Sequence, residues 1–219
     1  MKSIQRCNRV AVLLLTVGLG AVWMPAHADD GKKSANILKM LRADPELHRE
    51  AIIQGKQDAF FCANCHGEDG ISRYPEVPNL AGQNPEYVLT QTEAFLTGQR
   101  KDAFMEGMIK VLSERQKANV ALFYANAKVS PSRTSGDTPL AREGAAHYAR
   151  LCARCHGEKA LGDAVHPRLA GQQADYLRIN IRRYLTLSGE RFYAPMTATV
   201  TQLGEKNIES VVEYLSGLK

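Results

Sequence analysis

Two short motifs carry the residue types in this sequence that are best placed for chemistry. Cys62-Ala63-Asn64-Cys65-His66 and Cys152-Ala153-Arg154-Cys155-His156 share the spacing Cys-x-x-Cys-His, and a glycine follows each histidine. Four kinds of site use cysteines spaced in this way: a thioredoxin-like redox centre, a zinc site, a disulfide bond and a covalently attached haem. The redox centre needs a βαβ pattern around it, and this sequence contains none.

The spacing favours haem over the zinc site and the disulfide. Two cysteines and an adjacent histidine on one helical turn cannot easily surround a tetrahedral zinc ion, and a disulfide within Cys-x-x-Cys closes a loop too short to stabilise much. Two thiols on one face of a turn can instead form thioethers with the two vinyl groups of a haem, while the next histidine binds its iron. We predict two covalently bound haem c groups, with thioethers from Cys62, Cys65, Cys152 and Cys155 and proximal ligands His66 and His156.

Methionines further along the chain are candidates for the second axial iron ligand. A methionine there closes the iron and raises its reduction potential, which suits electron transfer, whereas an open position suits reaction with oxygen or peroxide. Met196 is the only methionine after the second motif and lies 40 residues beyond His156, and Met105 lies 39 residues beyond His66. We predict Met105 and Met196 as these ligands, with Met108 as the other candidate in the first copy of the repeat.

The motifs belong to two copies of one domain. They lie 90 positions apart, and the similarity continues downstream, because Pro78-Asn79-Leu80-Ala81-Gly82-Gln83 matches Pro167-Arg168-Leu169-Ala170-Gly171-Gln172. Tyr87 then matches Tyr176, and Met105 matches Met196. The polar segment between the copies is bracketed by prolines and predicts a linker. The expected organisation is a signal peptide (1–28), a first domain with an extra leader (29–129), a linker (130–138) and a second domain (139–219).

Apolar residues within each copy recur at helical spacing, and nothing alternates like a strand. Three helices are expected in each copy, and the chain is predicted to be all-α. In the leader, roughly residues 29–50, Asp44-Pro45-Glu46 predicts a helix start, since a capping residue precedes a proline in the first turn. The leader is either a helix that covers the first domain or an arm that docks a partner. The predicted helical stretches outside it are 85–97, 114–127, 140–151, 174–187 and 205–218.

The N-terminus accounts for much of the basic charge. Lys2, Arg6 and Arg9 precede an apolar stretch, and Pro25-Ala26-His27-Ala28 follows it, which is the pattern of a secretory signal peptide. We predict cleavage after Ala28. The remaining chain has 25 Lys and Arg against 23 Asp and Glu, so neither its total charge nor a basic run supports nucleic-acid binding.

The combined pattern resembles the cytochrome c4 family of dihaem periplasmic cytochromes. The resemblance covers about residues 55–219 and rests on Cys-x-x-Cys-His-Gly, Pro-x-Leu-Ala-Gly-Gln, a helix that begins near a tyrosine and a late methionine in each copy. It implies two tandem class I cytochrome c domains with the axial pairs His66/Met105 and His156/Met196. The sequence departs from the family in its leader before Gln54 and in Phe104-Met105-Glu106, where the family often has a proline near the ligand.

The resemblance also implies roles for residues around the haem groups. The carbonyls of Pro78 and Pro167 are expected to accept a hydrogen bond from the proximal histidines. Tyr87 and Tyr176 are expected either to bind haem propionates or to pack as plain rings. The residues themselves show an uneven charge: 29–128 hold 13 Lys and Arg against 14 Asp and Glu, whereas 141–219 hold 11 against 8. This difference could steer partners; alternatively Arg178, Arg182 and Arg183 neutralise propionates or solvate a helix.

The function implied is electron transfer without substrate chemistry at the protein. The donor is expected to be a dehydrogenase or a bc1-type complex, and the acceptor a terminal oxidase in a periplasmic respiratory chain. Two alternatives remain open: a haem enzyme, such as a dihaem peroxidase or a sulfur-compound oxidase, and a dedicated electron-transfer subunit of a dehydrogenase complex. The sequence also leaves open whether the protein associates with the membrane surface.

Overall fold

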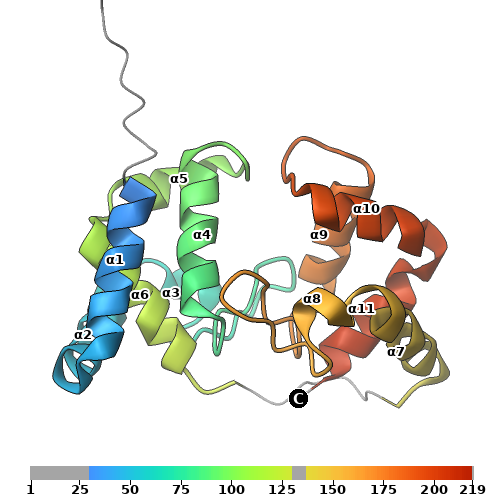
Figure 1. Ribbon diagram of the computed structural model, residues 1–219, viewed down its shortest axis with the longest axis horizontal. Coiled ribbons are helices and arrows are strands. Elements are labelled where there is room, and N and C mark those ends of the chain that lie inside the picture. Colours follow the sequence, from blue (N-terminus) through green and yellow to red (C-terminus); the bar gives the residue numbers. More distant parts are fainter. Residues whose placement is uncertain (1–29, 130–136, 219) are drawn as a thin grey trace, which may run out of the picture.

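The helices form two lobes that stand side by side in the computed structural model, which describes residues 30–129 and 137–218 (Figure 1). We call residues 30–129 the first half and residues 137–218 the second half. The predicted signal peptide and residues 130–136 of the predicted linker lie outside the described residues. In the described part of the chain no helix is both long enough and apolar enough to span a membrane.

The prediction of an all-α fold is confirmed. The first half contains α1 (Asp30–Ala43), α2 (Pro45–Asp58), α3 (Ala63–His66), α4 (Pro85–Leu96), α5 (Ala103–Lys110) and α6 (Glu114–Asn126). The second half contains α7 (Pro139–Leu151), α8 (Ala153–His156), α9 (Ala174–Leu185), α10 (Ala194–Leu203), the 3₁₀ turn η1 (Glu205–Asn207) and α11 (Ile208–Gly217). Apart from one isolated β-bridge, between Arg100 and Arg191, the described residues form no β-structure.

Each half is built on a close crossing between its first repeated helix and its last helix. In the first half α2 crosses α6 at Gly55, and in the second half α7 crosses α11 at Gly144. A Cβ added to Gly55 would lie 2.2 Å from the Asn119 carbonyl oxygen, and one added to Gly144 would lie 1.8 Å from that of Ser210. Only glycine lets the helix backbones approach this closely, so both copies of the repeat have glycine here.

Local capping signals explain where several helices begin. Asp44 accepts hydrogen bonds from the backbone N–H groups of Glu46 and Leu47 at the start of α2, as predicted for Asp44-Pro45-Glu46. Ser113 and Gln116 form a reciprocal capping box at the start of α6. These caps satisfy N–H groups that have no partner inside the helix.

The helix count of three per copy is wrong. The methionine segments form separate helices, α5 and α10, and the two motifs form the short helices α3 and α8. These four helices are only 4 to 10 residues long, and so short a segment gives little periodic signal. The stretch 205–218 also divides into η1 and α11, because Gly204 has a left-handed φ of 75° and a 3₁₀ turn follows it.

The leader is shorter than expected. α2 occupies most of its second part but runs on to Asp58 and crosses α6 as α7 crosses α11, so α2 belongs to the repeated unit. Only α1 has no counterpart in the second half. Leu38 and Leu41 of α1 are buried against Leu89 of α4 and Ala118 of α6. Of the two roles expected for the leader, α1 therefore has the covering one.

The second half has a charged surface where α1 covers the first half. The residues that match Leu89 and Ala118 in the repeat are Arg178 and Glu209, and their side chains form an ion pair of 2.8 Å between Nε and Oε1. Charged side chains are well hydrated and need no cover, whereas a leucine and an alanine gain from being covered. α1 therefore covers an apolar surface of the first half that has no equivalent in the second half.

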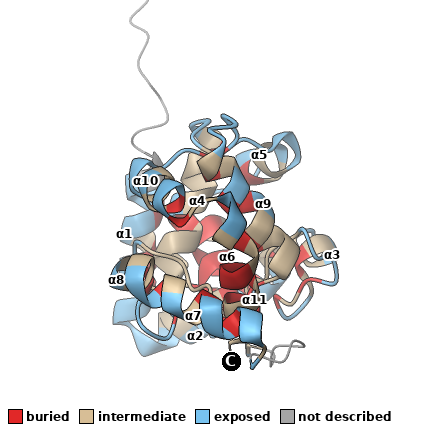
Figure 2. Ribbon diagram, turned by 90° about the vertical axis from the view of Figure 1, so that its right-hand side faces the viewer, coloured by how far each residue is buried: buried red, intermediate tan, exposed pale blue. Residues whose placement is uncertain are grey.

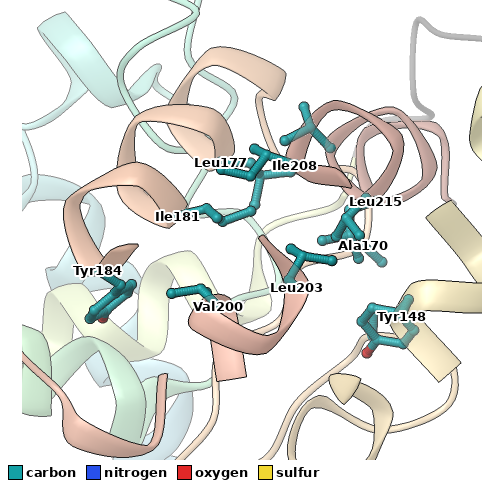
Figure 3. Close-up of a cluster of buried hydrophobic side chains, with 12 residues drawn as sticks. Tyr148, Ala170, Leu177, Ile181, Tyr184, Val200, Leu203, Ile208 and Leu215 are labelled. Atoms are coloured by element: carbon teal, nitrogen blue, oxygen red, sulfur yellow. The ribbon is translucent and has the colours of Figure 1, made fainter. Parts of the chain in front are cut away.

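The core of each half lies along its last helix, and Figure 2 shows buried residues gathered on α6 and α11. In the second half Leu177 and Ile181 of α9 meet Val200 and Leu203 of α10 and Ile208 of α11 (Figure 3). This layer holds α10, and with it Met196, in place.

Candidate haem sites

One helical turn brings the cysteines and the histidine of each motif together. The backbone N–H of His66 donates to the Cys62 carbonyl at 2.9 Å, and the N–H of His156 donates to the Cys152 carbonyl at 3.0 Å. Gly67 then ends α3 with a φ of 82°, a left-handed value that favours glycine. The same turn at Gly157 ends α8. Both motifs therefore present two thiols and an imidazole from one short helix.

A proline carbonyl fixes the tautomer of each proximal histidine. Nδ1 of His66 donates to the Pro78 oxygen at 2.9 Å, and Nδ1 of His156 donates to the Pro167 oxygen at 3.2 Å. Because a carbonyl can only accept, the hydrogen must be on Nδ1, and the lone pair of Nε2 is free to bind a metal. These are the hydrogen bonds expected from the resemblance, and the structure confirms both.

Burial keeps both imidazoles neutral. His66 and His156 are buried, and burial lowers the pKa of each ring below its ordinary value, more than the hydrogen bond to the proline carbonyl raises it. A neutral imidazole is the form that ligates iron. The histidines thus fit the ligand role that the motif predicts.

The cysteines suit thioethers better than zinc. All four thiols are free and half-buried, and burial raises the pKa of the Cys152 thiol to about 11 and that of Cys62 above its ordinary value. Zinc binds thiolates, so a raised thiol pKa works against it. Across the described residues no three His, Cys, Asp or Glu side chains converge as a metal site.

The predicted methionine ligands lie on equivalent short helices. Met105 is in the first turn of α5, where Asp102 caps the helix by accepting from the Met105 N–H at 3.0 Å. Met108 is on the same helix, and both side chains are half-buried. Met196 is in the first turn of α10 and packs against the core of the second half. The assignment of these methionines to iron stays a prediction.

Two tyrosines predicted near the haem groups contact arginines at the boundary between the halves. Arg191 donates to Oη of Tyr87 at 2.7 Å and to Oη of Tyr176 at 3.1 Å, and Arg100 also donates to Oη of Tyr176 at 3.1 Å. Gln91 accepts from both guanidinium groups. Both tyrosine hydroxyls therefore make hydrogen bonds, so these two side chains do more than pack as rings.

Sequence reasoning missed Arg100 and Arg191. Their signal was present, since they lie 91 positions apart in the same register as Met105 and Met196. The three arginines of α9 that were predicted to neutralise propionates or solvate the helix have carboxylate partners within the second half. Arg178 pairs with Glu209, Arg182 with Glu205, and Arg183 with Glu190.

Comparison with known proteins places these features in a family. Cytochrome c4 of Pseudomonas aeruginosa is 30% identical over 174 residues, which cover 75% of this chain and 87% of that protein. The chain belongs to the cytochrome c4 family. The crystal structure of reduced recombinant cytochrome c4 from Pseudomonas stutzeri matches with a TM-score of 0.68 at 28% identity, over 76% of this chain and 97% of that one.

Two further comparisons bear on the halves and on function. The family model for cytochrome c matches residues 141–219, nearly the whole second half. A thiosulfate dehydrogenase electron acceptor of Thiomonas intermedia is 30% identical over 176 residues, which cover 73% of this chain and 79% of that protein. As a member of the cytochrome c4 family, the chain is a dihaem electron-transfer cytochrome with two covalently bound haem c groups. The free thiols and the neutral imidazoles of both motifs fit these groups.

Proposed function

We propose that the protein carries single electrons in the periplasm, from a dehydrogenase or a bc1-type complex toward a terminal oxidase. The observation that carries this proposal is the duplicated site, in which both halves present two thiols and an imidazole with a fixed tautomer. The N-terminal signal pattern supports export, and cleavage after Ala28 belongs to the same proposal.

The residues of the two sites divide into anchors and ligands. Cys62, Cys65, Cys152 and Cys155 form the thioethers, and the axial pairs are His66/Met105 and His156/Met196. When bound, each haem supplies an iron that accepts and releases one electron. Nε2 of each histidine would bind the iron, and the methionine on α5 or α10 would supply the further protein ligand that excludes oxygen and peroxide.

A dedicated electron acceptor for one dehydrogenase is the second candidate. It is favoured by the similarity to the thiosulfate dehydrogenase electron acceptor of Thiomonas intermedia. Purification from native membranes separates the two candidates. A general carrier is expected to be released as a free protein, whereas a dedicated acceptor is expected to copurify with its dehydrogenase.

Axial ligation tests the carrier against a haem enzyme. Optical and electron paramagnetic resonance spectra of the ferric protein are expected to show two low-spin haems. Met196→Ala should open the iron of the second half and lower its potential, and Met105→Ala should do the same in the first half. Met108→Ala is the matched control on α5 and should leave both spectra unchanged.

Two results would contradict this assignment. A high-spin haem in the unaltered protein that reacts with peroxide would favour an enzyme. If Met108→Ala rather than Met105→Ala opened the first haem, Met108 would be the ligand there.

A further inference from the structure

The two loops that meet between the halves each contain one buried glutamine, at matching places in the repeat (Figure 1). Gln172 binds both backbone groups of Asn79, because its Oε1 accepts from the Asn79 N–H at 2.8 Å and its Nε2 donates to the Asn79 carbonyl at 3.0 Å. Gln83 binds Arg168 in the same way, at 2.7 and 3.0 Å. Each half therefore holds one backbone residue of the other by two hydrogen bonds.

Asn79 and Arg168, the two residues bound in this way, come immediately after Pro78 and Pro167. The carbonyls of these prolines orient the proximal histidines. The peptide group between Pro78 and Asn79 donates its N–H to Gln172 and accepts, at its carbonyl, the hydrogen bond from Nδ1 of His66. This peptide group is planar, so a contact at its N–H also fixes the direction of its C=O. An acceptor at the N–H polarises the group and makes the carbonyl a stronger acceptor.

The second half repeats this arrangement with the partners exchanged. The peptide group between Pro167 and Arg168 donates to Gln83 and accepts from Nδ1 of His156. Each proximal histidine is thus connected, through one peptide group of its own half, to a glutamine of the other half. The glutamine of the second half thus acts on His66, and the glutamine of the first half acts on His156.

We propose that Gln172 is a positioning residue for His66 and that Gln83 is one for His156, so that each half tunes the haem iron of the other. This inference rests on the proposed ligation of iron by the two histidines. A stronger hydrogen bond at Nδ1 makes the imidazole a more basic ligand, which stabilises ferric iron. Loss of the glutamine acceptor is therefore expected to raise the potential of the haem in the opposite half.

The test uses the haem-loaded, full-length protein with single substitutions in one half. Gln172→Met is expected to shift the reduction equilibrium of the haem at His66 about threefold toward the ferrous form, which is ~28 mV at 59 mV per tenfold. The haem at His156 should shift less. Gln83→Met should give the reverse pattern. Potentials are assigned to each half by proton NMR during a redox titration.

Gln173→Met is the matched control. Nε2 of Gln173 also donates across the boundary, to the Ser72 carbonyl at 2.7 Å and to the Asn79 side chain at 3.3 Å, but it does not touch the peptide group that binds His66. The control should leave both potentials unchanged. If Gln172→Met does not fold, Gln172→Glu replaces it. Its carboxylate loses the bond to the Asn79 carbonyl but still accepts from the Asn79 N–H. This variant is expected to lower the potential of the haem at His66 more than that of the other haem.

Any other pattern overturns the inference. Shifts confined to the half that carries the substitution, equal shifts in both halves, no shift, or an equal shift in the Gln173 control would all contradict it. These results are distinct from failure of the proposed function, which would show as the absence of two one-electron couples in the unaltered protein.

Discussion

At the scale of single residues, the two halves fill the space beside the attachment motif differently. In the first half Tyr124 of α6 packs near Ala59, whereas in the second half Tyr148 of α7 packs near Leu215. Tyr148 matches Ala59 in the repeat and Leu215 matches Tyr124, so the tyrosine lies on the last helix in the first half and on α7 in the second half.

The hydroxyl groups of Tyr124 and Tyr148 differ in their hydrogen bonding. Oη of Tyr148 donates to the Gly157 carbonyl at 2.6 Å, immediately after the second motif. Oη of Tyr124 is buried and has no hydrogen-bond partner in the described structure. We expect Tyr148→Phe to lower the free energy of unfolding of the second half by about 1–2 kcal/mol. Tyr124→Phe, the matched control, should change that of the first half by less than about 0.5 kcal/mol or stabilise it.

Calorimetry of the haem-loaded protein measures both tyrosine variants. Equal losses of stability would contradict the difference between the two hydroxyls.

At the scale of elements, α1 is the largest difference between the halves. It packs on α4 and α6 through Leu38 and Leu41, and Leu41 is completely buried. The second half needs no such cover, because Arg178 and Glu209 occupy the matching surface. We infer that α1 stabilises the first half by removing apolar surface from water.

Substitutions on opposite faces of α1 test this role. Leu41→Ala is expected to lower the free energy of unfolding of the first half by about 2–5 kcal/mol, because it leaves a cavity among α1, α4 and α6. Met40→Ala is the control on the exposed face and should cost less than about 0.5 kcal/mol. Thermal unfolding monitored at each haem should show no change in the second half. A loss shared by both halves would mean that α1 stabilises the whole molecule.

At the scale of the whole molecule, two arginines from different halves meet at the boundary. Arg191 is buried, and Arg100 and Arg191 donate to tyrosine hydroxyls and side-chain amides. Two guanidinium groups on one hydroxyl favour the anionic form of that hydroxyl.

Tyr176 is the group in which that anion can form. Burial raises its pKa, but the charges and hydrogen bonds of Arg100 and Arg191 together outweigh burial and lower the pKa from 10.0 to about 8. Because the folded pKa lies below the ordinary value, ionisation stabilises the folded protein. This stabilisation is complete above about pH 10 and is lost as the pH falls through about 8.

Carbon NMR of ring-labelled tyrosine measures this ionisation. We expect one tyrosine, assigned by Tyr176→Phe, to titrate near pH 8, and Arg191→Gln to return it toward 10. Resistance to urea should rise between pH 8 and pH 10 in the unaltered protein and less so in Arg191→Gln. A Tyr176 that titrates near 10 in both proteins would contradict the prediction.

The sequence by itself determined the chemistry and most of the architecture. Cys-x-x-Cys-His places thiols and imidazole on one helical turn through backbone hydrogen bonds that span only four residues, so spacing alone identifies the two sites. The repeat aligned Met105 with Met196, and the longer helices followed from apolar periodicity and from the cap at Asp44. All of these signals lie within a few residues of each other or recur at an offset of 89 to 91 residues.

Tertiary structure decided what the halves do to one another. The contacts of Gln172 with Asn79 and of Arg191 with Tyr87 join residues about 90 to 100 positions apart, and no local pattern specifies them. The same holds for α1, whose place on α4 and α6 depends on a surface that forms only after those helices pack. Periodicity records which face of a segment is buried, but a hydrogen bond between two loops depends on the distance and direction of both groups, which only the packed molecule sets.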